Sequence, residues 1–325
     1  MRRYVLGRLL QVIPMVLGVT LISFVIIKLA PGGFMTVMAD NPDVDPALVD
    51  RVRVMYGLDR PVMIQYLVWL GRLLTGNFGE SFVEARPVMA IYLQWLPNTL
   101  LLNVLGMCCI FLLAIPIGII AAVKQYSRFD FVVTAITFAS EALPSFVLAM
   151  VLIYAVALPS HGAIPLGGIA TYGVRLGNAG LTAVLLDRAR HLVLPLTVVV
   201  FGGLTGLTRY VRSSMLEVIR EDFVRTARAK GLPERVVIYR HALRNAIIPI
   251  ITVVGQMIPA MMGGSVVVEQ VFGWPGIGLM TLRAVLQRDY PVIMASLTVG
   301  AVLTIVTYLV VDVLYVVVDP RIKYS

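Results

Sequence analysis

Few of the 325 residues have the types and spacings that catalyse reactions or bind metal ions. The three histidines, His161, His191 and His241, are far apart and lack the short spacings of a zinc site. The two cysteines, Cys108 and Cys109, are adjacent and therefore poorly placed to bridge each other. The sequence has no G-x-x-x-x-G-K-[ST] phosphate loop and no nucleophile with a matching base. We expect no catalytic residue, metal site or cofactor on this chain. If the protein works with ATP, another subunit must hydrolyse it.

One acidic residue stands inside a long apolar run. Glu141 is the single charge of residues 131–158, and Pro144 and Ser145 follow it closely. A carboxylate in hydrocarbon is costly unless it faces a bundle interior, a partner or water, and a proline opens the helix that contains it. These three residues are therefore candidates for a translocation path. The alternative is that Glu141 is protonated or paired and only packs.

The composition explains why such a run is present. Hydrophobic residues make up 59% of the chain and charged residues 14%, and the mean hydropathy is +0.89. These values indicate a membrane protein. The net charge of +9 comes from basic residues in short segments between apolar runs. This distribution is typical of membrane topology signals and does not indicate nucleic-acid binding.

Six apolar stretches meet or approach the roughly 20 residues that cross a bilayer as a helix. They cover residues 9–27, 96–123, 131–158, 192–208, 246–268 and 291–311. The first could be a signal peptide, since Arg2 and Arg3 precede it, but its length and the five later spans favour a retained helix. The predicted fold class is all-α, a polytopic membrane protein with six transmembrane helices.

The distribution of Lys and Arg predicts the orientation. Residues 1–8, 124–130, 209–245 and 319–325 hold 16 of the 27 Lys and Arg, and residues 31–95 hold seven acids against five Arg. By the positive-inside rule, both termini and residues 209–245 are cytoplasmic. We divide the chain into an N-terminal cytoplasmic tail with the first span (1–30), an extracytoplasmic segment (31–95) that includes a short helix near residues 62–70, and a five-helix core (96–325).

The cytoplasmic segment 209–245 carries nine Lys or Arg, more than any other loop. Apolar residues recur there at a spacing of four and predict one amphipathic helix: Met215, Ile219, Phe223 and Ala227. Gly231 is expected to end this helix, and Pro233 suits the first turn of the next. We therefore predict a helix, break and helix lying on the cytoplasmic face. The alternative is a solvated basic loop that serves only topology.

The same loop carries a family resemblance. Residues 226–233 (TARAKGLP) and 240–246 (RHALRNA) resemble the cytoplasmic loop of the permease subunits of oligopeptide, dipeptide and nickel ABC importers. The family's general pattern is Glu-Ala-Ala, three residues, Gly, nine residues, then Ile-x-Leu-Pro. Ala227, Gly231 and Leu243 match it, whereas four residues depart in a way that resembles the peptide-permease branch: Arg225, Thr226, His241 and Arg244.

Further similar motifs cover nearly the whole chain in the expected order. They are residues 56–61 (YGLDRP), 76–81 (GNFGES), 269–278 (EQVFGWPGIG), 288–291 (RDYP) and 319–322 (DPRI). The resemblance implies a type I ABC importer permease fold in the bacterial inner membrane. It also implies a second homologous permease, two ATPase subunits that bind ATP and Mg, and an extracytoplasmic binding protein. The implied solute is a di- or oligopeptide, although relatives also carry nickel chelates or oligosaccharides.

The resemblance implies roles for two groups of residues. The contact with the ATPases would lie at Arg225, Thr226, Ala227, Arg228, Gly231, Leu232, Pro233 and Glu234. A turn-rich loop would lie near an outer gate under the binding protein: Phe272, Trp274, Pro275 and Gly276. Its two large aromatic residues also suit an anchor at the membrane–water interface. The competing hypothesis for the whole chain is a self-sufficient secondary transporter or channel, in which Glu141 would couple to protons.

Overall fold

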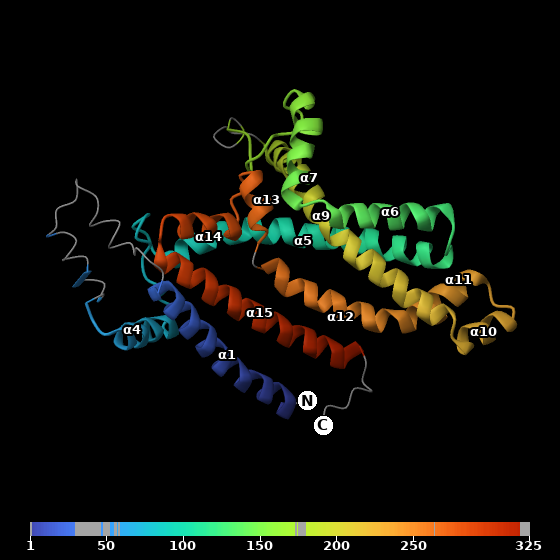
Figure 1. The fold of residues 1–325 in the computed structure, drawn as a ribbon, viewed down its shortest axis with the longest axis horizontal. Helices are drawn as coiled ribbons and strands as arrows, with labels where there is room; N and C mark the ends of the chain where they lie inside the picture. The colour runs from blue at the N-terminus through green and yellow to red at the C-terminus, as the bar shows by residue number, and fades with distance from the viewer. Residues whose placement is uncertain are drawn as a thin grey trace. The chain divides into compact units, whose positions relative to one another are not determined.

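The structure is a computed structural model that describes residues 2–29, 47, 53–54, 57, 59–172, 174, 180–262 and 264–318. Those residues fold almost entirely into helices, with one isolated β-bridge between Glu80 and Pro87 (Figure 1). They form two compact units, Met1–Pro97 with Gly276–Val306, and Asn98–Pro275 with Thr307–Ser325. The expected division at residues 30 and 95 does not follow these units, because residues 276–306 belong with the N-terminal part.

The first unit combines the N-terminal part of the chain with residues 276–306. It contains α1 (Arg2–Leu29), α4 (Val62–Leu74), the start of α5 (Val88–Val123), α14 (Ile277–Leu286) and the start of α15 (Tyr290–Val318). The helix predicted near residues 62–70 is α4. Its buried Tyr66 hydroxyl lies 3.1 Å from the Thr20 hydroxyl of α1, and its ring packs edge-on against Phe24 at 5.4 Å. Asp289, just before α15, accepts hydrogen bonds from the Ser81 hydroxyl and the Phe82 backbone N–H.

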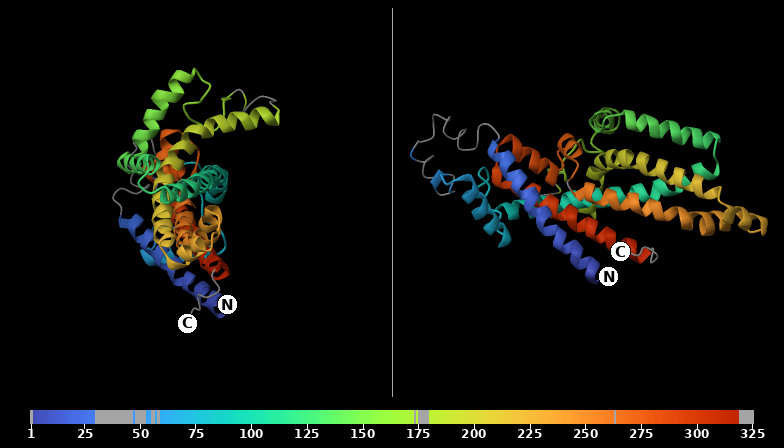
Figure 2. Two further views of the ribbon diagram at one scale, coloured as in Figure 1. Left: turned by 90° about the vertical axis from the view of Figure 1, so that its right-hand side faces the viewer. Right: turned by 60° about the horizontal axis from the view of Figure 1, so that its bottom comes forward.

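The second unit is built on α9 (Leu181–Ile219), which packs against both α6 (Arg128–Ala142) and α12 (Leu243–Met262) (Figure 2). Between α6 and α9 the chain forms α7 (Ser145–Leu152), the π-helix η1 (Ile153–Ala157) and the 3₁₀ helix η2 (Leu158–Ser160). Beyond α9 lie α10 (Asp222–Ala229), α11 (Glu234–Val236) and the π-helix η3 (Val237–Ala242), and α13 (Val266–Val271) follows α12. The largest core of the second unit joins α5, α9, α10, η3 and α12 through Ile110, Leu207, Val211, Met215, Val224, Val237 and Ile250.

Among the described residues, four helices are long and apolar enough to cross a membrane unaided: Leu10–Leu29, Val88–Val123, Leu181–Ile219 and Tyr290–Val311. Two bent helix pairs raise the number to six, namely Arg128–Ala142 with Ser145–Ser160, and Glu234–Ile247 with Pro249–Gly255. The described residues therefore confirm the all-α fold class. The number of spans equals the predicted six when each bent pair is counted as one span.

Three predicted spans differ from the helices found. The span at 131–158 is not straight, because the chain bends by 103° between Ala142 and Ser145, where Pro144 interrupts the helical hydrogen bonds. The span at 246–268 is wrong at its end, since α12 stops at Met262 and Val266 begins α13. The span at 192–208 is part of the much longer α9, whose polar residues also take helical conformation. Residues 30–46 and 319–325, which hold other sequence motifs, lie outside the described residues.

Candidate coupling element and translocation-path residues

The predicted amphipathic helix of the basic loop is two helices. α9 ends at Ile219, Arg220 caps it, and Glu221 adopts an extended conformation (φ −66°, ψ 149°) before α10 begins at Asp222. The predicted single stripe is therefore wrong, because the extended residue shifts the helical phase. Val224 (0% exposed) and Ala227 (5%) form the buried face of α10, whereas Phe223 is 41% exposed.

The turn between α10 and α11 has the geometry that its glycine predicted. Gly231 has φ +75°, in the left-handed region, and its N–H donates to the Arg228 carbonyl at 2.9 Å. Pro233 is the N-cap of α11, one position earlier than the first turn in which we expected it. Arg228 closes the turn with two hydrogen bonds to Glu234, from Nη2 to Oε1 at 2.8 Å and from Nε to Oε2 at 3.3 Å. This hydrogen bonding raises the pKa of the Arg228 guanidinium.

The remaining predicted contact residues lie on the open side of this turn. Arg225 donates to Asp222 at 3.3 Å, but its side chain is 71% exposed. Leu232 is 37% exposed, and Thr226 is exposed with its hydroxyl bonded to the Asp222 carbonyl. We call residues 222–236 the coupling element. It has one apolar face buried in the unit and another face, with basic and apolar side chains, that is open to a partner.

The coupling element is fixed to two long helices. Val237, Ile238 and Ala242 of η3 are buried against α10 and lead directly into α12. In addition, the Ser214 hydroxyl of α9 donates to the Ala246 carbonyl of α12 at 3.2 Å. A displacement of the coupling element would therefore move both α9 and α12, since well-packed contacts transmit motion.

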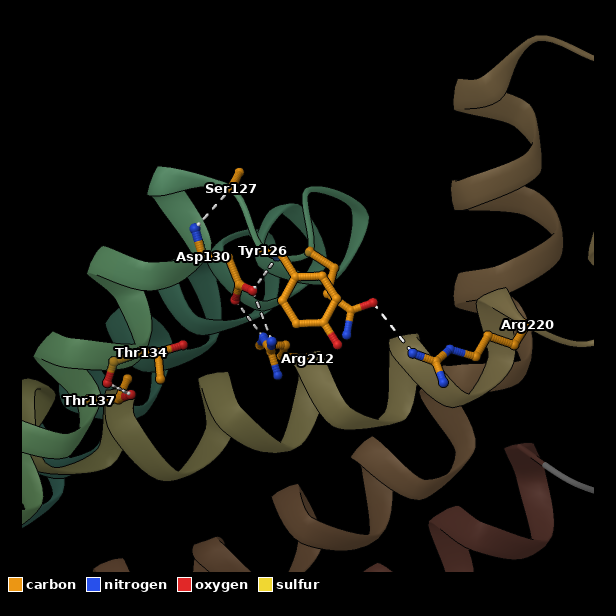
Figure 3. Close-up of polar contacts among 8 residues, drawn as sticks. Tyr126, Ser127, Asp130, Thr134, Thr137, Arg212 and Arg220 are labelled. Atoms are coloured by element: carbon orange, nitrogen blue, oxygen red, sulfur yellow. Dashed lines mark hydrogen bonds and ion pairs between the residues drawn. The ribbon is translucent and has the colours of Figure 1, made fainter.

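A charged contact that we did not predict joins α6 to α9 at the same end of the unit (Figure 3). Arg212 donates to both carboxylate oxygens of Asp130, from Nε at 2.6 Å and from Nη2 at 2.9 Å, and the Asp130 side chain is 5% exposed. Asp130 also accepts the Tyr126 N–H, and the Ser127 hydroxyl caps α6 by accepting the Asp130 N–H. The Ser-x-x-Asp spacing of Ser127 and Asp130 is a helix-start signal that could have located one half of this contact. Arg212 is 82 residues away, and no local pattern pairs them.

The candidate path residues lie where α6 ends. Arg209 of α9 donates from Nη1 to Glu141 Oε2 at 2.5 Å, so Glu141 is paired. The guanidinium carbon of Arg209 also lies 5.3 Å from the centre of the Phe138 ring. Leu143 and Pro144 are extended, and Ser145 begins α7. The structure thus brings Glu141 to the break that Pro144 makes, while the path role of these residues remains a prediction.

The aromatic residues of the predicted gate loop are buried, which corrects the expectation of an interfacial anchor. Phe272 is 1% and Trp274 0% exposed, packed with Leu102, Ala149 and Val198. The indole Nε1–H donates to the Asn98 carbonyl at 3.0 Å, and the Asn98 amide donates to the Pro275 carbonyl at 2.8 Å. These two hydrogen bonds, together with the packing of the rings, hold the loop to α5. Gly276 begins the other unit, and the gate role stays a prediction.

No group of three potential metal ligands occurs among the described residues.

The comparisons with known proteins agree with the fold. Residues 114–324 match the family model described as binding-protein-dependent transport system inner membrane component, and residues 1–103 match its N-terminal model. The chain belongs to this family of inner-membrane transport permeases.

Similar proteins cover the full length. The chain is 43% identical over 325 residues to the oligopeptide transport system permease protein AppB of Bacillus subtilis (strain 168). It is 35% identical over 339 residues to the dipeptide transport system permease protein DppB of Escherichia coli (strain K12), and both matches cover 100% of each chain. Among solved structures, the inward-facing MetNI methionine ABC transporter aligns with a TM-score of 0.55 at 16% identity, over 71% of this chain and 97% of that one. That structural likeness shows the fold of an ABC importer permease.

Proposed function

We propose that this chain is the permease subunit of a peptide importer driven by ATP, moving di- or oligopeptides inward across the bacterial inner membrane. Relatives across the whole chain are named as oligopeptide and dipeptide permeases, which supports a peptide solute. The chain forms half of the translocation path, and a second, homologous permease forms the other half. An extracytoplasmic binding protein delivers the solute.

The observation that carries this proposal is the way the coupling element is packed on one face and exposed on the other. Its buried face is packed onto α9 and α12, while Arg225 and Leu232 on its open side remain available. One of the two ATPase subunits, which bind ATP and Mg, docks on this open side. The coupling element and, with an even number of spans, both termini then lie in the cytoplasm. Closure of the ATPases then displaces α9 and α12 as one body.

The experiment is uptake of a radiolabelled dipeptide into proteoliposomes. The complete set of two permeases, two ATPases and the binding protein should accumulate peptide only when ATP is supplied. Omitting the ATPases should abolish accumulation. Accumulation by this chain alone on a proton gradient would instead support the secondary transporter, and would overturn the proposal.

A further inference from the structure

The Glu141–Arg209 pair lies deep in the apolar part of the second unit. Glu141 is ten residues after Phe131, where the apolar run 131–158 begins, which is about 15 Å along a helix at 1.5 Å per residue. The hydrocarbon core of a bilayer is about 30 Å thick, so the Glu141 carboxylate lies near its middle. Arg209 directly follows the apolar stretch 192–208, and its guanidinium reaches the same depth because it is bonded to Glu141.

Both side chains are nevertheless half exposed on the surface of this chain, 46% for Arg209 and 54% for Glu141. A charged group facing lipid at this depth is costly. The Asp130–Arg212 contact shows how the same unit builds a structural ion pair: two hydrogen bonds and a carboxylate that is 5% exposed. The Glu141–Arg209 contact has one hydrogen bond and leaves polar atoms of both groups open. This geometry favours a water-filled path over packing.

The chemistry of the pair matches an unmodified peptide, which carries one ammonium and one carboxylate. A guanidinium binds a carboxylate through two parallel hydrogen bonds, and a carboxylate accepts from an ammonium. Phe138 supports the Arg209 guanidinium through its ring face, so that Arg209 is held in place while Glu141 is released. The Pro144 break beside the pair gives the path its irregular backbone, which is tolerated at membrane depth where it lines a cavity.

We propose that Glu141 and Arg209 recognise the two termini of the peptide inside the translocation path. The ion pair opens, Glu141 receives the terminal ammonium, and Arg209 receives the terminal carboxylate. After this exchange each of the four charges has a partner, so the peptide can pass the middle of the membrane without an unpaired charge. This proposal rests on the proposed peptide function and adds a specificity-determining site to it.

The test uses the complete reconstituted transporter with Glu141→Gln, Arg209→Gln and the double variant. Glu84→Gln with Arg86→Gln is the matched control, because that pair is also a Glu–Arg ion pair, 3.3 Å apart, with similarly exposed side chains (44% for Glu84 and 47% for Arg86), but lies outside the spans. Uptake of a free dipeptide should fall about tenfold or more in each single variant and in the double variant, since each loses a charge-assisted hydrogen bond to the peptide. ATP hydrolysis stimulated by the loaded binding protein should stay within about twofold of the wild type. The control should resemble the wild type in both measurements.

The double variant separates recognition from structure, because it leaves no unpaired charge and should assemble even if a single variant does not. Recovery of uptake in the double variant would overturn the proposal, since a packing role is satisfied by removing both charges. A second measurement uses wild-type protein and a dipeptide with a photoreactive side chain. Labelling should fall on residues of α6 and α9 near the pair and should disappear when both termini are blocked, whereas unchanged labelling by the blocked probe would overturn the proposal. Failure of the wild-type transporter to take up any peptide would contradict the proposed function itself.

Discussion

Arg212 of α9 holds both oxygens of the Asp130 carboxylate, at 2.6 and 2.9 Å, although the two residues are 82 positions apart. Asp130 is in the first turn of α6, which begins at the end of the unit that carries α10 and α11 (Figure 1). The contact joins α6 to the helix that leads into α10. A displacement of α9 is therefore expected to move α6 with it.

Asp130→Asn should destabilise the protein, because it leaves the Arg212 guanidinium with a weakened partner in a largely buried place. Breaking one side of a buried pair costs about 3 kcal/mol, so the detergent-solubilised transporter should unfold at a lower temperature. Arg212→Lys should also destabilise it, since an ammonium cannot make the two parallel bonds. The Glu84→Gln and Arg86→Gln control should leave the unfolding temperature unchanged. Equal unfolding temperatures for Asp130→Asn and wild type would show that the contact does not hold α6 to α9.

Gly231→Val should disturb the coupling element without unfolding the spans. No atom lies within 4 Å of the position that a Cβ would take, so the effect comes from φ +75° alone, which costs a β-branched residue roughly 1–2 kcal/mol. We expect lower ATPase docking or less uptake per ATP hydrolysed. Gly231→Asn is the matched control, because asparagine tolerates the left-handed conformation. Comparable losses in both variants would point to the side chain and not to the turn.

Arg228 and Glu234 can be tested by charge reversal. Both side chains are more than one third exposed, so breaking the pair should change stability by less than about 1 kcal/mol. Arg228→Glu should lower peptide-stimulated ATP hydrolysis, because it opens the turn, and adding Glu234→Arg should restore it. If the double variant is as inactive as the single one, the individual charges matter to the ATPase contact and their mutual bond does not.

Topology can be measured by cysteine labelling after Cys108 and Cys109 are replaced. A cysteine introduced at Glu84 should react with a membrane-impermeant reagent in intact cells, and one at Arg225 only after permeabilisation. Both positions are exposed in the structure, so access to each is set by the membrane. Reaction of the Arg225 position in intact cells would reverse the proposed orientation.

Hydrophobic length and proline chemistry made much of this fold predictable. Uninterrupted apolar runs identified the long helices, and Gly231 and Pro144 marked a left-handed turn and a helix break. The Glu221 break was missed because no glycine or proline marks it. The burial of Val224 in place of Phe223 follows from that missed change of helical phase. Asp130 with Arg212 and Glu141 with Arg209 depend on tertiary contacts across 82 and 68 positions, which a single sequence does not encode as a local pattern.

In the proposed importer, the open side of the coupling element contacts the ATPases. Photo-crosslinking measures this directly, with a photoreactive amino acid placed at Arg225 or Leu232 and, as the control, at Glu84 in the assembled transporter. We predict an adduct with an ATPase subunit from positions 225 and 232 and none from position 84. An intact complex that gives no ATPase adduct from either position of the coupling element would contradict the account.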